Sequence, residues 1–513
     1  MQATIFSATT MGVNASEVLV EVDVSLGLIN FFIVGLPDAA IRESKQRIQT
    51  ALKNCGIKLP DRKITVNLAP ANIKKEGTLF DVPIALGVLQ AAHVITIDQQ
   101  LLQETVVLGE LSLDGSIRPV RGVLPIAHDV CGRLGKKRLI VPQENAAEAA
   151  LVSDCTVIGV ANLLELVEYL QGTRTIEPTT STWQTTAQQF HPDIDFAQVK
   201  GQTQAKRALQ IAAAGHHNVL FVGSPGAGKT MLAQRLATIM PPLTTAQAIA
   251  ATKVYSVAGK LDQQQLVARR PFRAPHHTTS QAGLIGGGTF PQPGEVSLAH
   301  HGILFLDELT EFKRTVIEAL RQPIEHGVVT IARAQQTITF PASFLLVAAL
   351  NPCPCGFFGE KRRTCSCSSA EIQRYLSKLS GPFLDRIDIQ VYVPALEYET
   401  INDHVPATGS QRLYAQVERA VARQHKRLGA QQCNAAMNPT DIERWCTTTP
   451  AAECALRQAF DALALSMRGY HKILKIARTI ADLDDSEVIE LTHVQEAILY
   501  RSLDQTLQAS IKF

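Results

Sequence analysis

No uninterrupted apolar run in this sequence approaches the roughly 20 residues needed to span a bilayer. The amino terminus, Met1–Phe6, lacks the basic start and apolar core of a signal peptide. An excess of charge of either sign is also missing, because 49 basic residues face 47 acidic ones. These absences predict a cytoplasmic protein that does not use a membrane. They do not decide about nucleic acid, because a basic pore can be hidden in a neutral total.

The composition is that of ordinary soluble globular domains, with 46% hydrophobic and 19% charged residues. At roughly 150 residues per domain, the 513 residues predict two to four domains. Six of the ten cysteines are scattered, as expected for reduced thiols without chemistry in a reducing compartment. They are Cys55, Cys131, Cys155, Cys433, Cys446 and Cys454.

A glycine-rich run between an apolar strand and a helical pattern predicts a nucleotide site. Its residues are Gly223, Ser224, Pro225, Gly226, Ala227, Gly228, Lys229, Thr230 and Met231. Glycines let backbone N–H groups converge on phosphates, and the following helix N-terminus favours negative charge. Lys229 can reach the β and γ phosphates, and Thr230 can hold Mg²⁺. ATP and Mg²⁺ are therefore the predicted cofactors.

A second motif supports ATP hydrolysis. The apolar strand 303–306 is followed directly by Asp307 and Glu308. At the carboxyl end of a buried strand, Asp307 would hold Mg²⁺ and Glu308 would polarise the attacking water. Many strands end in a solvated acidic turn, so this motif is informative only together with the glycine-rich run.

Residues 172–195 interrupt the patterned sequence, because Thr, Ser, Gln and Pro dominate there without apolar periodicity. We interpret them as a linker. Strand-like runs alternate with helical stretches before it, which predicts an α/β domain over 1–171. After it, the nucleotide motifs predict an α/β ATPase core with a parallel sheet over 196–395. Apolar residues at three- and four-residue spacing predict a helical lid over 396–513.

Further segments resemble the magnesium chelatase-like AAA+ ATPases, and the YifB/ComM family in particular. They are RPFRAPHHT at 270–278, PGEVSLAH at 293–300, ILFLDE at 303–308, NPCPCG at 351–356 and SGPFLDRID at 380–388. The resemblance covers essentially the whole chain. It implies a Lon-protease-like amino-terminal domain, an AAA+ core and a helical carboxyl-terminal lid. It also implies a homohexameric helicase on single-stranded and branched DNA that drives branch migration in natural transformation, with recombination proteins as further partners.

The resemblance assigns three more residues to the motor. Asn351 ends an apolar strand, where the first sensor faces the γ phosphate; the alternative is an asparagine that opens a turn. Arg386 corresponds to the arginine finger that reaches the ATP of the neighbouring subunit, or it pairs within its own chain with Asp385 or Asp388. Arg468 occupies the position of a second sensor on the lid, although an arginine that begins a helix is more often solvated.

The resemblance also implies two insertions that line the pore of a ring. Residues 328–340 are predicted to form two strands around a tight polar turn, with Arg333 near its tip. A cation there can follow DNA phosphates without reading bases. The glycine-rich stretch 286–290 is expected to form the other loop. A plain surface hairpin is the alternative interpretation.

Four further cysteines form a C-x-C-x₉-C-x-C pattern: Cys353, Cys355, Cys365 and Cys367. Four thiolates within fifteen residues can close a tetrahedral Zn²⁺ site. Zinc is favoured over two disulfides in a cytosolic protein, and its expected role is to brace the loop that follows Asn351. Two pairs of adjacent histidines are interpreted as packing rather than as metal ligands: His276 and His277, and His300 and His301.

Residues 74–81 and 109–122 resemble the catalytic half of Lon proteases, in which a lysine activates a serine nucleophile. Leu79 stands at the approximate position of that serine, and Leu124 or Pro125 at that of the lysine. None of them can act as nucleophile or base. The resemblance therefore implies a catalytically inactive protease fold used for assembly or DNA engagement.

Two other functions share these motifs. A magnesium chelatase-type motor subunit has the AAA+ core, but it typically lacks a Lon-like domain and acts with a tetrapyrrole-binding partner. A DNA-binding scaffold would hydrolyse ATP only to assemble, so it would bind branched DNA without moving it. Stimulation of ATP hydrolysis by DNA or by a porphyrin complex separates the first alternative from a DNA motor.

Overall fold

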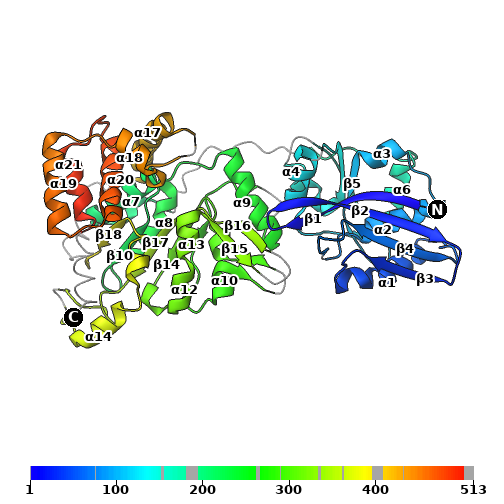
Figure 1. Cartoon of the computed structure of the whole chain (residues 1–513), viewed down its shortest axis with the longest axis horizontal. Coiled ribbons are helices and arrows are strands. Elements are labelled where there is room, and N and C mark those ends of the chain that lie inside the picture. Colours follow the sequence, from blue (N-terminus) through cyan, green and yellow to red (C-terminus); the bar gives the residue numbers. More distant parts are fainter. Residues whose placement is uncertain are drawn as a thin grey trace.

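The computed structural model describes residues 2–75, 77–133, 135–151, 155–180, 194–261, 266–288, 291–332, 337–360, 363–395, 408–430 and 432–501. An amino-terminal domain, a central domain and a helical domain follow one another along the long axis (Figure 1). Arg333 and residues 181–193 of the predicted linker lie outside the described residues. No helix in the described part of the chain has the length and apolarity required to cross a membrane.

The amino-terminal domain is built on a seven-stranded sheet of order β3-β4-β2-β1-β5-β8-β9. Helix α2 packs on β1 and β2 and is buried on nearly every side, which is why its sequence is apolar except for Asp81 and Gln90. The strands are β1 Gln2–Met11, β2 Asn14–Ser25, β3 Asn30–Val34, β4 Lys63–Ala69, β5 Thr105–Val107, β6 Glu110–Leu111, β7 Ile117–Arg118, β8 Arg138–Pro142 and β9 Thr156–Val160. The helices are α1 Ala39–Asn54, α2 Asp81–Ala91, α3 Gln99–Gln103, α4 Val123–Arg133, α5 Ala146–Ala149 and α6 Leu163–Leu170.

Two details of this domain concern the predictions from the sequence. Within the predicted linker 172–195, the N–H of Thr179 donates to the carbonyl of Val157 at 2.9 Å. The prediction of a reduced thiol at Cys155 is wrong, because the structure places Cys155 in a disulfide. Scattered positions in a sequence do not report which cysteines the fold brings within bonding distance.

The central domain contains a five-stranded parallel sheet of order β11-β14-β17-β10-β18. Its inner strands are buried along their whole length, as parallel strands covered on both faces are. The strands are β10 Val219–Val222, β11 Phe272–Arg273, β12 Gly286–Gly287, β13 Gln292–Pro293, β14 Ile303–Leu306, β15 Val328–Ala332, β16 Thr337–Pro341, β17 Leu345–Leu350 and β18 Ile389–Tyr392. The helices are α7 Thr203–Gly215, α8 Lys229–Ile239, α9 Thr245–Ala258, α10 Gln281–Ile285, α11 Glu295–Leu298, α12 Arg314–Ala319, α13 Arg321–His326, α14 Ser369–Leu376 and α15 Gly381–Leu384.

The helical domain shares one buried apolar cluster with α7, α8 and the sheet of the central domain. Its helices are α17 Ser410–Leu428, α18 Pro439–Trp445, α19 Pro450–Ala462, α20 Met467–Leu483 and α21 Leu491–Leu499. A buried ionic network fastens it internally: Asp482 accepts from Arg427 at 2.7 Å and from Arg478 at 3.0 Å. Arg478 is therefore part of the internal structure of this domain.

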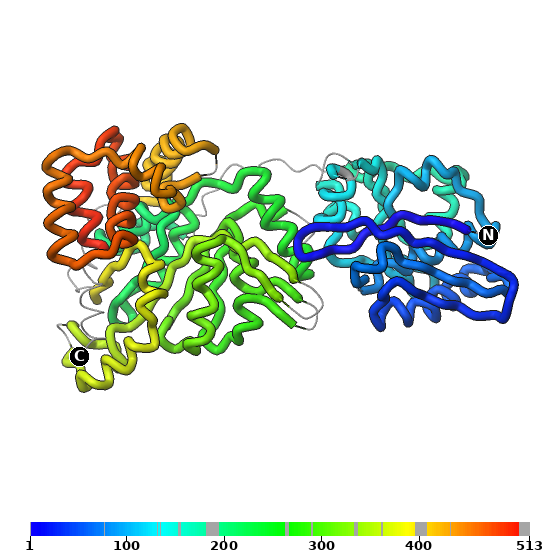
Figure 2. The backbone as a smooth tube through the Cα atoms, in the orientation of Figure 1, coloured from blue at the N-terminus to red at the C-terminus, as the bar shows by residue number. Residues whose placement is uncertain are grey.

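The amino-terminal domain contacts the central domain at two places. The turn between β1 and β2 lies against the β15–β16 hairpin, where a Cβ added at Gly12 would be 3.0 Å from Ile338 Cγ2 (Figure 2). Helix α4 packs against α9. Beside this helix pair, the hydroxyl of Ser256 donates to buried Glu148 at 2.5 Å, and Lys253 lies 3.3 Å from Asp129. Burial raises the pKa of Glu148.

Candidate functional site

The glycine-rich run forms a loop between β10 and α8, at the edge of the sheet where its parallel strands end, here called the carboxyl edge. Gly226 and Gly228 have φ angles of +78° and +90°, which glycine adopts without strain. A Cβ at Gly223 would lie 2.1 Å from the carbonyl oxygen of Val393. The backbone therefore has a shape that other residues would disturb, and it leads into a helix N-terminus, where anions bind.

Lys229, the first residue of α8, points back into this loop. Its ammonium donates to the carbonyls of Gly223 at 2.5 Å and Ser224 at 3.0 Å, and to Oδ1 of Asn351 at 3.0 Å. Burial lowers the pKa of Lys229, and the carboxylates near it oppose that shift. The structure thus brings together Lys229 and Asn351, which the sequence separates by 122 residues.

The predicted magnesium ligands also meet at the carboxyl edge. The hydroxyl of Thr230 donates to Oδ2 of Asp307 at 2.8 Å, and Oδ1 of Asp307 accepts the N–H of Glu308 at 2.9 Å. Glu308 has a φ of +50°, so the chain turns sharply after β14. Its Oε2 lies 3.3 Å from Nδ1 of His277. The donor set of one hydroxyl and one carboxylate beside a phosphate-binding loop suits Mg²⁺.

Arg386 and Arg468 meet at one carboxylate. Nη2 of Arg386 lies 2.5 Å from Oε2 of Glu325, and Arg468 pairs with the other oxygen of the same side chain. Burial tends to raise the pKa of Glu325, but the hydrogen bonds from both guanidinium groups lower it overall. Asp388, one alternative partner considered for Arg386, instead pairs with Lys472 at 2.8 Å. The arginines of the central and helical domains are thus held as a pair.

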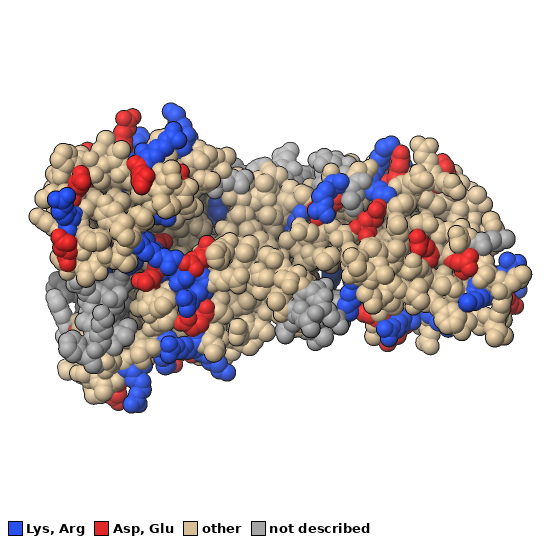
Figure 3. Space-filling model, viewed as in Figure 1, with Lys and Arg blue, Asp and Glu red and all other residues tan. Residues whose placement is uncertain are grey.

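This arginine pair lies at the opposite edge of the sheet from the phosphate-binding loop. Asn218, which precedes β10, donates to the carbonyl of Arg386 at 3.3 Å. The four residues of β10 then separate the two edges by roughly 13 Å. Arg386 and Arg468 line a cavity of about 430 Å³ at the amino-terminal edge of the sheet. Figure 3 shows basic and acidic side chains together along this seam between the helical and central domains.

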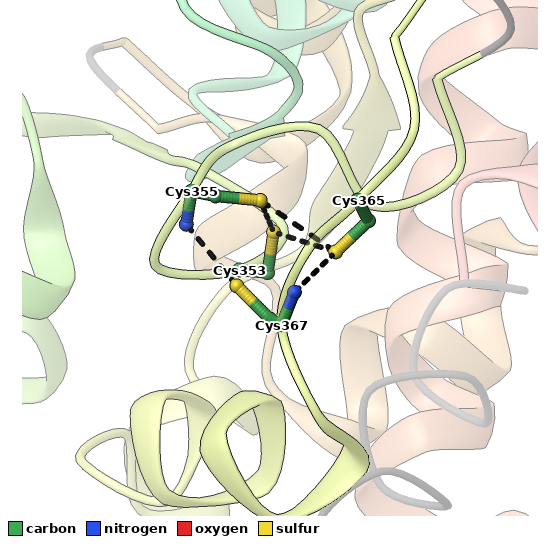
Figure 4. Close-up of side chains that lie close together, drawn as sticks. All are labelled: Cys353, Cys355, Cys365 and Cys367. Carbon is green, nitrogen blue, oxygen red and sulfur yellow. Dashed lines mark hydrogen bonds between the residues drawn. The ribbon is translucent and has the colours of Figure 1, made fainter.

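The four clustered cysteines point toward one another (Figure 4). The Sγ of Cys353 lies 3.3 Å from that of Cys355 and 3.7 Å from that of Cys365. All four ligand atoms, including that of Cys367, lie within 4.8 Å of one another. Zn–S bonds of about 2.3 Å in a tetrahedron place sulfurs about 3.8 Å apart. The four-cysteine cluster can therefore hold a metal ion.

The paired histidines at 300 and 301 and Met231 have different surroundings. The rings of His300 and His301 lie 3.8 Å apart, and burial, with the neighbouring His301, lowers the pKa of His300 to about 3. Nδ1 of His300 accepts the N–H of Ser343 at 3.1 Å. Met231, at the end of the nucleotide motif, is 44% exposed. The imidazole of His300 is therefore buried in the packed interior of the central domain.

Three family models match the chain in order. "Subunit ChlI of Mg-chelatase" matches residues 20–145, "Magnesium chelatase, subunit ChlI" matches 195–401, and "Magnesium chelatase, subunit ChlI C-terminal" matches 407–501. The competence protein ComM of Haemophilus influenzae is 43% identical over 514 residues, which cover 99% of this chain and 98% of that protein. The chain belongs to the YifB/ComM family of magnesium chelatase-like AAA+ ATPases.

Other YifB/ComM relatives and a distant one agree with this assignment. YifB of Escherichia coli is 39% identical over 98% of this chain and 97% of its own length. Lon protease 2 of Bacillus subtilis is 32% identical over 102 residues, which are 20% of this chain and 17% of that protease. The predicted fold class of a Lon-like α/β domain, an AAA+ core with a parallel sheet and a helical carboxyl-terminal region is confirmed.

Sequence reasoning missed three side chains of this YifB/ComM-family site. His277 beside Glu308 was interpreted only as packing. Glu325, the shared partner of the arginines, carries no motif signal. Glu360, which accepts from the hydroxyl of Ser224 at 3.0 Å, lies among the residues that separate the two cysteine pairs. The RPFRAPHHT segment was the available signal for His277, whereas the two glutamates are identified only by their contacts.

Proposed function

We propose that the chain is a homohexameric, Mg²⁺-dependent DNA translocase of the cytoplasm that promotes branch migration while incoming single strands are integrated in natural transformation. The observation that carries the proposal is the meeting of Lys229 with Asn351 and of Thr230 with Asp307 at one edge of the sheet. The Haemophilus relative is named as a competence protein, which supports the biological setting. Single-stranded and branched DNA are the proposed substrates, and recombination proteins the proposed further partners.

In the proposed ATP site, each residue has one task. The loop from Gly223 to Met231 and Lys229 bind the phosphates, while Thr230 and Asp307 hold Mg²⁺. Bound Mg²⁺ supplies charge neutralisation for the phosphates. Glu308 orients and polarises the attacking water, and Asn351 contacts the γ phosphate.

We propose that the subunits assemble through the two opposite edges of this sheet. Because Arg386 and Arg468 lie at the edge away from their own phosphate-binding loop, we propose that they complete the ATP site of the next subunit. Such an interface joins two different surfaces, and repetition around a rotation axis closes it into a ring. Glu325 keeps both guanidinium groups paired until a γ phosphate offers them a stronger partner.

We also propose that Cys353, Cys355, Cys365 and Cys367 bind one structural Zn²⁺. The proposal is supported by the closeness of their sulfurs and by the all-thiolate donor set, which suits zinc. Elemental analysis of freshly purified, reduced protein is expected to find about one zinc per chain. A zinc content far below one would reject this metal assignment.

Movement of a DNA junction tests the DNA motor directly. The wild-type protein with ATP and Mg²⁺ is expected to convert a labelled three-strand or four-way junction, whereas Lys229→Ala is expected to convert none. The measurement is separation of the labelled products on a native gel. Hydrolysis of ATP without junction movement would favour the DNA-binding scaffold, and stimulation by a porphyrin complex rather than DNA would favour the chelatase-type motor.

A second prediction concerns the β15–β16 hairpin, whose strands pair from Val328 opposite Pro341 to Ala332 opposite Thr337. We propose that Arg333, predicted near its tip, follows DNA phosphates in the pore. Arg333→Ala is expected to keep its ATPase activity while weakening DNA binding about tenfold or less and slowing junction conversion. Fluorescence anisotropy on single-stranded DNA measures the first effect. Unchanged junction conversion by this variant would remove Arg333 from the motor.

A further inference from the structure

The loop that carries the four cysteines also touches the phosphate-binding loop. We infer that the metal held by the four-cysteine cluster sets the position of the phosphate-binding loop, so that nucleotide affinity depends on the metal content of the chain. This inference rests on the proposed zinc site and adds a control of the ATP site to it. Two contacts join the loops, and Asn351, just before the first cysteine, contacts Lys229 of the phosphate-binding loop.

The first contact joins Gly356 to Pro225 of the phosphate-binding loop. A Cβ built on Gly356 would lie 2.6 Å from Cδ of Pro225, closer than side chains approach. Gly356 also has a φ of +84°, so glycine alone suits both its backbone and its neighbour. It immediately follows Cys355, one of the four ligands. A shift of the cysteine loop is therefore passed directly to Pro225.

The second contact is polar. Oε2 of Glu360 accepts a hydrogen bond from Oγ of Ser224 at 3.0 Å, and Ser224 is buried. Asn351, which precedes Cys353 by two residues, accepts from Lys229 at 3.0 Å. Three residues of the phosphate-binding apparatus, Ser224, Pro225 and Lys229, thus contact one segment of chain, residues 351–360. The segment therefore packs against the phosphate-binding loop and can set its position.

Cys353 anchors the segment in the apolar cluster of the central domain, but the described part of the segment has little secondary structure. Among the described residues between the end of β17 at Leu350 and the start of α14 at Ser369, there is no strand or helix. Local turns remain, such as the hydrogen bond from Gly356 N–H to the carbonyl of Cys353 at 3.0 Å. Four metal–sulfur bonds would remove most of the freedom of such a segment, because metal binding supplies folding free energy where secondary structure does not.

A pair of glycines in this segment gives a matched test. Gly356 and Gly359 both have positive φ angles, +84° and +80°, but among the described residues a Cβ on Gly359 would meet only the Tyr392 hydroxyl, at an ordinary 3.9 Å. Both alanine variants place a side chain at a positive φ angle, which destabilises the backbone. Only Gly356→Ala also brings its Cβ too close to Pro225. We expect both variants to keep their zinc. Gly356→Ala should weaken binding of fluorescent ADP about tenfold or more, and Gly359→Ala by no more than about twofold.

Removal of the metal is the second arm, and it uses the wild-type chain. A zinc chelator under reducing conditions is expected to lower zinc content and ADP affinity together, and added Zn²⁺ should restore both. Cys365→Ser should reproduce the loss, while Cys454→Ser, an exposed cysteine outside the cluster, should change neither. Elemental mass spectrometry, ADP fluorescence and far-UV circular dichroism are read in parallel, so that no result depends on ATP hydrolysis.

The outcomes separate the inference from the proposed function. Zinc loss with unchanged ADP affinity, or equal effects of Gly356→Ala and Gly359→Ala, would overturn the link between the loops while the zinc site stands. A wild-type chain without zinc would reject the metal site itself. Loss of ADP affinity on chelation, with helical content retained and recovery on zinc addition, would establish the link even if the protein never moves DNA.

Discussion

Arg386→Ala is expected to lower steady-state ATP hydrolysis by about 10³- to 10⁵-fold, the usual contribution of an arginine finger. Binding of fluorescent ADP by the same variant should stay within about twofold of wild type, because Arg386 lies at the edge of the sheet away from its own phosphate-binding loop. Phosphate release measures the first quantity. As a matched control, Arg321→Ala removes an arginine of α13 that pairs with Glu318 at 2.9 Å, and it should leave hydrolysis unchanged.

Mixing two inactive variants shows from which chain the arginine comes. Arg386→Ala keeps its phosphate-binding loop, and Lys229→Ala keeps its arginine, so an interface between the two variants can contain both functional parts. A random equal mixture should recover about a quarter of wild-type activity, because one interface in four then has the intact combination. Mixed rings that form, as seen by native mass spectrometry, yet stay inactive would contradict an arginine finger supplied by the neighbouring subunit.

Glu308→Gln is expected to lower ATP hydrolysis by about 10²- to 10⁴-fold while ATP stays bound, because an amide cannot take a proton from the attacking water. The substitution keeps the shape of the side chain beside His277. Single-turnover hydrolysis and retention of radiolabelled ATP on a filter are the two measurements. We expect the ATP-bound ring to be longer-lived than that of the wild type.

Glu311→Gln is the matched control for this prediction. Glu311 lies three residues further along the same turn and only approaches Lys378 at 4.0 Å, so its loss should leave hydrolysis unchanged. If Glu308→Gln hydrolysed ATP at the wild-type rate, the proton acceptor would be another group. If it failed to bind ATP, Glu308 would have a structural role in shaping the turn after β14.

Local patterns predicted the elements of the ATP site closely. The apolar strand expected before the glycine-rich run is β10, and the apolar runs before Asp307 and Asn351 are β14 and β17. These elements are recognisable because burial of a parallel sheet demands continuous apolar runs, and because phosphate binding demands glycine at fixed spacing. The hydrophobic spacing likewise located the helices of the carboxyl-terminal domain.

Contacts between segments far apart in the chain could not be predicted from the sequence. Glu325 and Arg468 are 143 residues apart, and nothing in the neighbourhood of either residue indicates the other. The sequence also gives no sign that Gly356 approaches Pro225, because a glycine after a cysteine suggests only a turn. Such contacts depend on how finished elements pack, whereas periodicity reports only which face of one element is buried.

The contact surface between the amino-terminal domain and the β15–β16 hairpin affects how a truncated chain would behave. Val13, beside Gly12 in the β1–β2 turn, packs into the apolar cluster that contains Ile338 and Phe340 of the hairpin. A truncated chain that begins at the central domain would expose this apolar surface of the hairpin to water. It would also leave Lys253 without Asp129. The isolated central domain therefore exposes a surface that the amino-terminal domain covers in the full chain, and aggregation of such a fragment would report the loss of that cover.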